Sequence, residues 1–279
     1  MKQPRILIHL HVYYPEQVDY FVKKLGNING VKADFFITTI KENLPALKPL
    51  LRFNPEVKVV ANKGYDILPF IKILQKVELK NYDYILKLHT KRTRDLDYFN
   101  RGRYFTGSSW RNLLVDSLLG SPEIFAENIA ILEGDKKLGL IGSWYCIRTE
   151  KIGDIRNKFG ISTYTGDAKE ITYIAGTMFL ARAKPYEQIF KWGIDDDSFE
   201  TTPDWVHSRT FAHLAERLMG FVITMAGYEI KGTGAKNIRF EISQFLARIL
   251  RIIFYTKVTD SGKRIVKIFK IPVYHRRVK

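Results

Sequence analysis

Cysteine is nearly absent from this sequence: Cys146 is the only one in 279 residues. A single thiol excludes an intramolecular disulfide framework and a metal site built from several cysteines, and it is compatible with a reducing compartment. Long apolar runs are absent too. The basic N-terminal segment leads into only about five consecutive apolar residues, too few for a signal peptide, and no stretch approaches the roughly 18 apolar residues of a membrane span. We therefore expect a cytoplasmic protein that does not cross the bilayer.

Acidic residues are scarce relative to basic ones, 29 against 45, which gives a formal net charge of +16. Such a charge points to anionic partners: a nucleotide diphosphate, acidic lipid headgroups or nucleic acid. The excess lies mainly at one end. Residues 236–279 hold twelve Lys and Arg against two acids, a net of +10 that leaves +6 for residues 1–235. We expect a main domain over residues 1–235 and a separate basic tail over residues 236–279.

The familiar nucleotide-binding signatures are also missing. The chain has no GxGxxG and no GxxxxGK[ST] motif, which disfavours a dinucleotide oxidoreductase or a P-loop kinase. No helix-turn-helix, zinc-finger or aromatic-basic single-strand motif accompanies the positive charge, so a nucleic-acid partner is not expected.

The first hundred residues do contain a regular alternation of strand and helix patterns, with β-branched runs followed by apolar residues at helical spacing. The expected strands are residues 5–12, 33–39, 57–61 and 82–88, and the expected helices are residues 15–25, 44–53 and 67–77. This alternation predicts an α/β fold with a Rossmann-like, largely parallel sheet.

Ligands of open parallel sheets bind beyond the carboxyl ends of the strands. The polar or special residues at those ends form our candidate nucleotide-sugar site: His11, Tyr13, Thr38, Asn62, Gly64, Asp66, His89, Lys91 and Arg92. Gly64 can adopt a left-handed conformation, and Asp66 is expected either to cap the next helix or to hold a sugar hydroxyl. Lys91 and Arg92 suit a diphosphate, because a point charge and a guanidinium fork can neutralise it without a metal.

Several strings occur in an order that resembles the rhamnan synthesis protein F family of bacterial glycosyltransferase domains, over roughly residues 5 to 232. The strings are IHLHVYY at residues 8–14, NKGYDILPF at 62–70, YDYILKLHTK at 82–91, WR at 110–111, AGTMF at 175–179 and HLAERL at 213–218. The resemblance implies a GT-A-like fold and a donor such as dTDP-rhamnose or a UDP-hexose, for example UDP-galactofuranose. It also implies a lipid-linked acceptor of O-antigen or rhamnan type and other polysaccharide-assembly enzymes as partners.

The second half, residues 109–235, is expected to hold the acceptor, while residues 1–108 bind the nucleotide. Helices are expected within residues 110–134 and strands at 138–142 and 172–181, around a polar loop at 148–170 that is long enough for a mobile lid. Gly176 and Thr177 should let the backbone approach a sugar, although a simple strand bulge explains them equally well.

A base that deprotonates the acceptor hydroxyl is needed if the transfer inverts configuration, and a carboxylate or a histidine can serve. Asp204 is the first candidate, Glu200 the second and His207 the third, while Trp205 is suited to stack on a sugar ring. An ordinary helix cap would also explain Asp204. The sequence has Ser208-Arg209-Thr210 where the family pattern has an Asp-Gly-Thr-like triplet, which weakens any base placed there.

A helix is expected over residues 206–219, and it places His213, Glu216 and Arg217 on one face, at offsets of three and four. We interpret these three as a supporting hydrogen-bonded network beside the acceptor.

No metal or other cofactor is expected, because Lys91 and Arg92 occupy the place where related glycosyltransferases hold a cation with two acids. Asp95 and Asp97, and the run of acids at 195–197, could hold Mg or Mn, since hard cations take oxygen ligands. Solvated loops are the simpler explanation of both.

The tail combines apolar residues at steps of three and four with arginines, first over residues 238–253 and again over 265–269. Basic amphipathic helices of this kind lie in membrane interfaces, so we expect a peripheral protein at the inner face of the cytoplasmic membrane. A C-terminal helix packed on the main domain is the alternative. A catalytically silent module that binds polymer or partners is the alternative to an enzyme.

Overall fold

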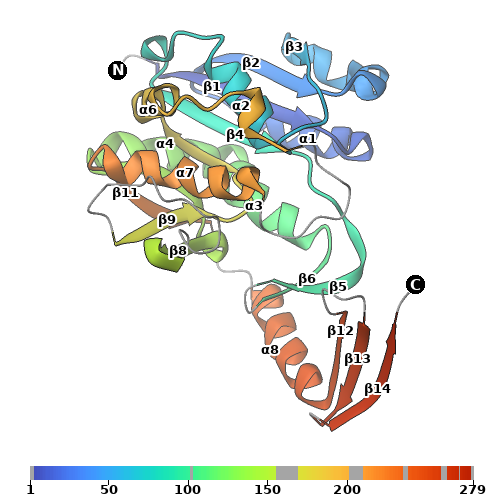
Figure 1. Ribbon diagram of the computed structural model, residues 1–279. Helices are drawn as coiled ribbons and strands as arrows, with labels where there is room; N and C mark the ends of the chain where they lie inside the picture. The colour runs from blue at the N-terminus through green and yellow to red at the C-terminus, as the bar shows by residue number, and fades with distance from the viewer. Residues whose placement is uncertain are drawn as a thin grey trace. The chain divides into compact units, whose positions relative to one another are not determined.

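A computed structural model describes residues 3–100, 103–154, 169–200, 210–234, 238–258, 263–269 and 271–277 (Figure 1). Contacts divide the chain into two compact units. Unit 1 comprises Met1–Arg92 and Ser108–Gly234, and unit 2 comprises Thr93–Gly107 and Ala235–Lys279. The sequence had placed residues 93–107 in the main domain, whereas the structure groups them with the tail.

Unit 1 is built on a seven-stranded sheet of order β11-β7-β10-β4-β1-β2-β3. Its strands are β1 Arg5–Val12, β2 Lys32–Thr39, β3 Glu56–Val59, β4 Tyr84–His89, β7 Leu138–Ser143, β10 Phe179–Arg182 and β11 Glu229–Thr233. β1, β2, β3 and β4 are parallel, as are β7 and β11, while β10 is antiparallel to both of its neighbours. The expected α/β class with a mostly parallel sheet is confirmed.

The helices of unit 1 form two groups around this sheet. The helical elements are η1 Pro15–Gln17, α1 Val18–Leu25, η2 Lys41–Phe53, α2 Ile67–Leu74, η3 Leu79–Asn81, α3 Ser109–Leu119, α4 Pro122–Gly134, η4 Trp144–Cys146, η5 Lys184–Tyr186, α6 Glu187–Lys191, η6 Asp196–Ser198 and α7 Phe211–Met225. α2 contacts α7, and α3 contacts both α1 and α4. β4 is buried at every position, so both of its faces are covered.

Three expected elements differ in kind or extent. Residues 44–53 were expected to be α-helical but belong to the 3-10 run η2, because Pro45 and Pro49 lack the N–H that an α-helix requires. The strand expected over residues 172–181 is two strands, β9 Glu170–Ile174 and β10, separated by a turn in which Gly176 and Thr177 have positive φ. The helix expected from residue 206 begins at Phe211 in the described part of the chain.

The expected lid loop at residues 148–170 is wrong at its start, because β8 Ile147–Lys151 pairs antiparallel with β9. Sequence reasoning missed this strand because charged residues alternate with Ile147 and Thr149, so the segment reads as a polar loop. Residues 155–168 lie outside the described residues, so the lid prediction is not tested there.

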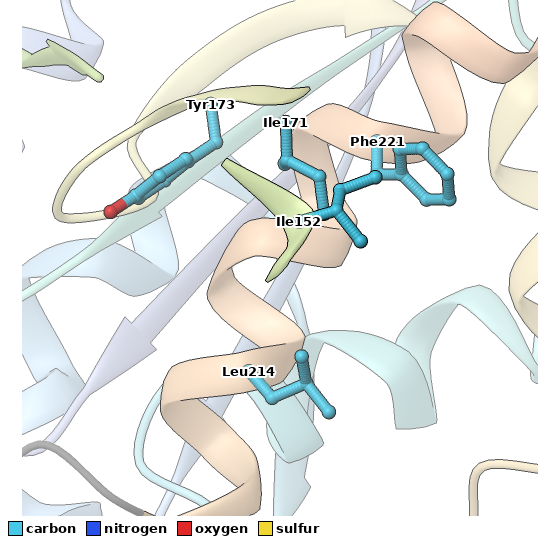
Figure 2. Close-up of a cluster of buried hydrophobic side chains, with 5 residues drawn as sticks. All are labelled: Ile152, Ile171, Tyr173, Leu214 and Phe221. Atoms are coloured by element: carbon cyan, nitrogen blue, oxygen red, sulfur yellow. The ribbon is translucent and has the colours of Figure 1, made fainter. Parts of the chain in front are cut away.

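A buried cluster attaches α7 to β9, and Figure 2 shows it. Its members are Ile152, Ile171, Tyr173, Leu214 and Phe221. Gly220 allows this approach, because a Cβ atom there would lie 2.2 Å from the carbonyl oxygen of Thr172. The small residue therefore fixes where the polar side chains of α7 project.

Unit 2 contains a hairpin, a helix and an antiparallel meander. The elements are β5 Arg94–Asn100, β6 Arg103–Gly107, α8 Ile238–Ile253, β12 Phe254–Val258, β13 Lys263–Ile268 and β14 Ile271–Arg277. The sequence correctly placed a helix over residues 238–253, but residues 265–269, expected to repeat it, lie in β13 and the turn after it. The β-branched pair Ile265 and Val266 favours a strand there. Within the described residues, no helix is both long and apolar enough to cross a bilayer.

Candidate functional site

The carboxyl ends of β1, β2 and β4 bring three predicted site residues into register. His11 pairs with Thr38 on one side and with His89 on the other. All three side chains are buried. The sheet edge predicted from the alternation of strands and helices is therefore where these residues meet.

One hydroxyl group serves two histidines. The Oγ1 of Thr38 lies 2.8 Å from His9 Nε2 and 2.9 Å from His11 Nδ1. Because a hydroxyl donates one hydrogen and accepts others, a single Thr38 can serve one nitrogen of each of two neutral rings. Burial lowers the pKa of His11 to about 3, with the charge of Asp66 opposing it, and burial also holds the pKa of His9 well below its usual range.

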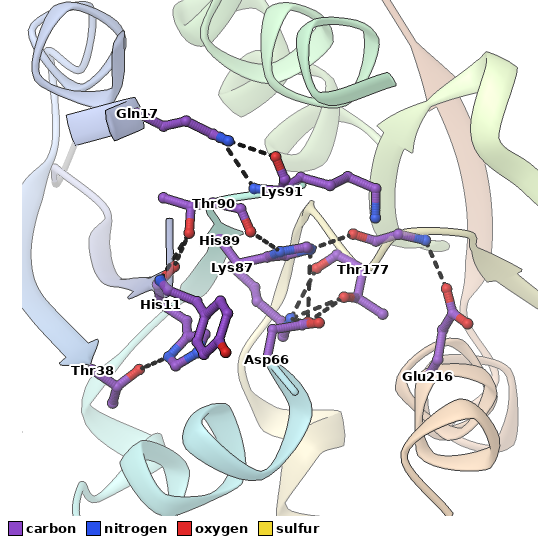
Figure 3. A network of polar contacts seen from close by, with 12 residues as sticks. His11, Gln17, Thr38, Asp66, Lys87, His89, Thr90, Lys91, Thr177 and Glu216 are labelled. Carbon is purple, nitrogen blue, oxygen red and sulfur yellow. Dashed lines mark hydrogen bonds and ion pairs between the residues drawn. The ribbon is translucent and has the colours of Figure 1, made fainter. Parts of the chain in front are cut away.

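A buried lysine that the sequence analysis missed lies at the centre of the site (Figure 3). Lys87, on β4, is fully buried and forms an ion pair with Asp66. Its Nζ also donates to the carbonyl oxygen and the Oγ1 of Thr177, at 3.1 and 3.0 Å, and Thr177 Oγ1 donates to Asp66 at 2.5 Å. The carboxylate thus receives donors from β4 and from the turn before β10.

The electrostatics keep this pair charged. Burial by itself would raise the pKa of Asp66, but the charges of His89 and Lys87 and hydrogen bonds from Lys87 and Thr177 hold it well below its usual range. Burial lowers the pKa of Lys87, and Asp66 opposes that shift. Asp66 occupies the N-cap position of α2 without a side-chain capping bond, so the capping explanation of this residue is wrong.

The loop before Asp66 aims its side chain inward. Gly64 and Tyr65 both have positive φ, 67° and 52°. A Cβ on Gly64 would lie 2.6 Å from Leu68 Cβ and 2.7 Å from Phe199 Cδ1. Only glycine fits this combination of backbone conformation and close packing. Tyr65 then packs edge-on against His213 at a centroid distance of 5.6 Å.

The turn at Gly176 and Thr177 is hydrogen-bonded to both β4 and α7. His89 Nε2 lies 2.8 Å from the carbonyl oxygen of Gly176, and the N–H of Gly176 donates to Glu216 Oε1 at 2.7 Å. His89 Nδ1 lies 2.9 Å from the carbonyl oxygen of Thr90, while burial, opposed by Asp66, lowers the pKa of His89 to about 4. Three predicted residues from distant parts of the sequence, His89, Gly176 and Glu216, therefore meet at this turn.

Lys91 is held rigidly through its backbone. Its N–H donates to Gln17 Oε1 at 3.1 Å, and Gln17 Nε2 donates back to its carbonyl oxygen at 2.5 Å. Its Nζ lies 3.7 Å from the centroid of the Trp110 ring. Burial lowers the pKa of Lys91, and Asp66 and Glu216 oppose this. Among the described residues, no carboxylate lies within ion-pair distance of this ammonium group. Figure 3 shows its side chain extending toward the side where Glu216 lies.

Tyr13 and Asn62 lie at the rim. Asn62 Nδ2 donates to Tyr13 Oη at 3.2 Å, and the N–H of Tyr13 donates to Thr90 Oγ1 at 2.8 Å. Arg92 follows Lys91 and is exposed. The nine residues predicted for nucleotide-sugar binding thus all belong to the described structure, at or beside one sheet edge.

Arg217 lies beside Glu216, with its Nη1 3.7 Å from Glu216 Oε2, and it has further partners of its own. It is 1% exposed and donates to both carboxylate oxygens of Glu150, at 2.8 and 3.0 Å, and to the carbonyl oxygen of His213 at 2.5 Å. His213 Nδ1 lies 2.7 Å from Thr210 Oγ1. These contacts connect α7 to β8 and to its own first turn, and the sequence analysis missed Glu150.

The predicted catalytic residues are only partly described. Asp204, Trp205 and His207 lie outside the described residues. Both carboxylate oxygens of Glu200 accept the N–H of Phe211, at 3.1 and 3.0 Å. This carboxylate therefore satisfies a free donor at the start of α7, as a helix cap does.

Two of the acids considered for a metal, Asp195 and Asp196, have other partners. Asp195 caps η6, and Asp196 forms an ion pair with Lys72 at 2.6 Å. In the described part of the chain, no group of three or more His, Cys, Asp or Glu side chains is placed to hold a metal ion.

Together these features define an α/β protein whose mostly parallel sheet gathers a buried polar network at the carboxyl ends of β1, β2 and β4. Within that class the chain belongs to the rhamnan synthesis protein F family, whose sequence model matches residues 1–228.

Among curated proteins, the chain is 25% identical over 235 residues to an uncharacterized protein, WxcX, from two strains of Xanthomonas campestris pv. campestris. The alignment covers 81% of this chain but only 32% of WxcX, so the chain spans about a third of the length of these relatives.

Solved structures give more distant likenesses. A CMP:2-keto-3-deoxy-manno-octonic acid synthetase complexed with CTP is 10% identical, with a TM-score of 0.41 over 88% of this chain and 99% of that chain. A 4-diphosphocytidyl-2C-methyl-D-erythritol synthase from Anaerococcus prevotii is also 10% identical, with a TM-score of 0.39 over 87% of this chain and 98% of that chain.

Proposed function

We propose that this protein is a glycosyltransferase of polysaccharide biosynthesis that transfers a sugar from a nucleotide diphosphate donor to a lipid-linked cell-surface glycan. Membership of the rhamnan synthesis protein F family supports a role in polysaccharide biosynthesis. A GT-A-like fold is supported by the sheet, in which antiparallel β10 is inserted between a parallel block of four strands and a parallel pair. The donor we propose is dTDP-rhamnose or a UDP-hexose such as UDP-galactofuranose.

The observation that carries this proposal is the environment of Lys91. Its ammonium group lies on an aromatic ring, its backbone is fixed by Gln17, and the nearby carboxylates have other donors: Asp66 has Lys87 and Thr177, and Glu216 has Gly176. A positioned cation of this kind suits a diphosphate, since it meets negative charge that develops on the leaving group. Arg92 would add a second cation at the exposed rim.

The remaining site residues have complementary roles in this proposal. Asn62 and Tyr13 at the rim offer an amide and a hydroxyl to the nucleotide or sugar, and Gly176 keeps the backbone close to the bound donor. Asp204 is proposed as the base that deprotonates the acceptor, with Glu200 and His207 as alternatives and Trp205 as a stacking surface. His213, Glu216 and Arg217 support this arrangement from α7.

The acceptor places the reaction at the inner face of the cytoplasmic membrane, together with other polysaccharide-assembly enzymes. A lipid-linked glycan is confined to the bilayer, and the strongly basic tail would hold the enzyme next to it.

A catalytically silent binding module is the second candidate. One specific observation favours it: Asp66, the carboxylate nearest to the centre of the described site, is neutralised by Lys87 and bonded to Thr177. An acid held in this way is a poor proton acceptor, so a silent module would bind the donor without turnover.

Thermal-shift measurements test donor binding, because a ligand specific to the native state raises its stability. We would compare dTDP-rhamnose, UDP-galactofuranose, UDP-galactose, UDP-glucose and GDP-mannose, each with and without EDTA. We expect one donor to shift the melting temperature regardless of EDTA. A shift that EDTA abolishes would instead require a metal, and no shift with any donor would contradict the proposed site.

The variant Lys91→Met tests the diphosphate contact. We expect it to weaken donor affinity roughly tenfold or more, since hydrogen bonds to charged groups contribute about 1.5–3 kcal/mol. Lys48→Met, at an exposed lysine of η2, removes the same charge and should leave affinity unchanged. Donor turnover, followed as sugar transfer or hydrolysis, then separates enzyme from silent module: binding without any turnover would favour the module.

A further inference from the structure

Helix α8 of unit 2 buries the less apolar of its two faces. The helix contacts β6, β12 and β13 of the same unit. Its buried side chains are Phe240 and Gln244, at 8% and 5% exposure, and Ala247, one turn further along, is half-buried. These positions recur at steps of four and three, so they define a single face.

The opposite face of α8 is apolar and exposed. Ile238, Ile242, Phe245 and Ile249 recur at steps of four, three and four, with Leu246 and Leu250 beside them. Their exposed fractions range from 40% at Ile249 to 72% at Ile238. In a globular protein such a stripe normally faces the core. Here it faces outward, so an apolar environment must come from elsewhere.

A second group of exposed apolar residues continues the stripe at one end of unit 2. The N–H of Phe269 donates to the carbonyl oxygen of Ile253, the last residue of α8, at 2.8 Å. Phe254 pairs with Ile268, which pairs with Ile271. Figure 1 shows the end of α8 and the β13–β14 turn at the same end of the unit. The exposed rim comprises Phe254, Ile268, Phe269 and Ile271, at 52%, 41%, 64% and 65%.

Charge identifies the occupant of this surface. Residues 236–279 carry twelve basic and two acidic residues, and Arg239 and Arg248 are exposed on α8 itself. A second copy would bring the same positive charge to the contact and be repelled. Nucleic acid would satisfy the charge but leave the apolar stripe in water. An anionic bilayer satisfies both, because apolar side chains enter the acyl boundary while basic residues meet the headgroups.

We propose that the apolar stripe of α8 and the rim at the β13–β14 turn form a docking surface for anionic lipid bilayers, with α8 lying in the plane of the interface. This inference extends the proposed peripheral location to a defined surface. Its test uses no nucleotide, so its failure is distinguishable from a failure of the proposed transferase activity.

The experiment measures sedimentation of the full chain with vesicles of phosphatidylcholine alone and with vesicles that also contain phosphatidylglycerol. We expect binding to the anionic vesicles. Phe245→Glu combined with Ile249→Glu should weaken that binding at least tenfold. The matched control is Leu51→Glu combined with Met225→Glu in unit 1, where the exposed fractions are 54% and 51%, and it should bind like the parent chain.

A second pair of variants tests the charge contribution. Arg239→Gln and Arg248→Gln should each weaken binding to anionic vesicles roughly fivefold, as expected for a basic residue at an anionic surface, and should reduce its salt dependence. Circular dichroism of every variant checks that α8 remains folded.

Three outcomes would overturn the proposal. One is equal vesicle binding by the parent and the Phe245/Ile249 variant. Another is no vesicle binding, combined with salt-sensitive binding to nucleic acid. The third is a concentration-dependent dimer that the glutamate pair disrupts while vesicles leave the dimer intact.

Discussion

At the residue scale, the Lys87–Asp66 pair carries much of the site's organisation. A charge removed from water is tolerated when it is paired and its remaining hydrogen-bonding groups are satisfied. Thr177 supplies those further bonds on both sides of the pair. The pair therefore fixes the positions of α2, β4 and the turn before β10 relative to one another.

Lys87→Met should destabilise the fold by about 3–5 kcal/mol, because it leaves the Asp66 carboxylate, which is only 16% exposed, without its cationic partner. Adding Asp66→Asn should recover much of that loss. Lys76→Met is the matched control: its ion pair with Glu56 is about half exposed on both sides, and losing it should cost no more than about 1 kcal/mol. Urea unfolding of the four proteins measures these differences, and equal losses for Lys87→Met and Lys76→Met would contradict the argument.

The two histidines that share Thr38 predict a loss of stability in mild acid. Their folded-state pKa values lie below the unfolded value of about 6.5, so stability is complete above that pH and is lost as pH falls and the unfolded chain takes up protons. Each should contribute a slope of up to about 1.4 kcal/mol per pH unit, down to about pH 3 for His11. Carboxylates with lowered pKa values, such as Asp66, change the stability with pH only below about pH 4.

Denaturant unfolding between pH 7 and pH 4 measures this slope. His11→Gln removes one titrating ring, so the slope of unfolding free energy against pH should fall by the contribution of about one proton, about 1.4 kcal/mol per pH unit. Identical slopes in the parent protein and the variant would mean that His11 is not held neutral.

Sequence patterns located the site better than they assigned its contacts. His11, Thr38 and His89 were predictable because strand ends of a parallel sheet converge. Lys87 was not singled out, although a lone lysine within an otherwise apolar run of a central strand is a usable signal. The Gln17 contact to Lys91, which joins residues 74 apart in sequence, has no local signature at all.

At the element scale, the loop that begins α2 depends on Gly64. Gly64→Ala should destabilise the protein by about 1–2 kcal/mol from the left-handed backbone and by about 1–3 kcal/mol more from overlap with Leu68 and Phe199. Gly30→Ala is the control, because its φ of 69° is similar but its Cβ would meet nothing within 4 Å. Gly30→Ala should therefore destabilise the protein only by the cost of the left-handed backbone, about 1–2 kcal/mol. Melting temperatures of the two variants test the difference, and equal shifts would mean that packing at Gly64 is looser than described.

The strands and helices of unit 1 were largely predictable, because the strands are short β-branched or aliphatic runs and the helices carry apolar residues at helical spacing. Failures arose where another constraint outweighed periodicity. Pro45 and Pro49 turned an expected α-helix into η2, and the turn at Gly176 divided one expected strand in two. In the tail, periodicity was correct for α8, while the short β-branched run in β13 was too brief to separate strand from helix.

At the scale of the whole molecule, the two units bind different proposed ligands and should respond to them separately. We expect two thermal transitions in calorimetry. The nucleotide-sugar donor should raise the transition of unit 1, and anionic vesicles should raise that of unit 2, each by mass action. At a ligand concentration 100 times Kd, the stabilisation is about 2.7 kcal/mol.

Calorimetry with each ligand alone and with both together measures this independence. A single transition that either ligand raises to the same extent would mean that the two units unfold cooperatively.

Unit 2 is assembled from two stretches of chain that lie far apart in sequence, the hairpin Thr93–Gly107 and the segment Ala235–Lys279. During synthesis the hairpin leaves the ribosome long before the helix that contacts it, and the intervening residues belong to unit 1. Contacts between such distant segments form slowly, because a long loop must close first. Unit 1 can therefore mature as a nascent chain while unit 2 waits, and the apolar stripe of α8 emerges only after all of unit 1 has been synthesised, so it is not exposed during the synthesis of unit 1.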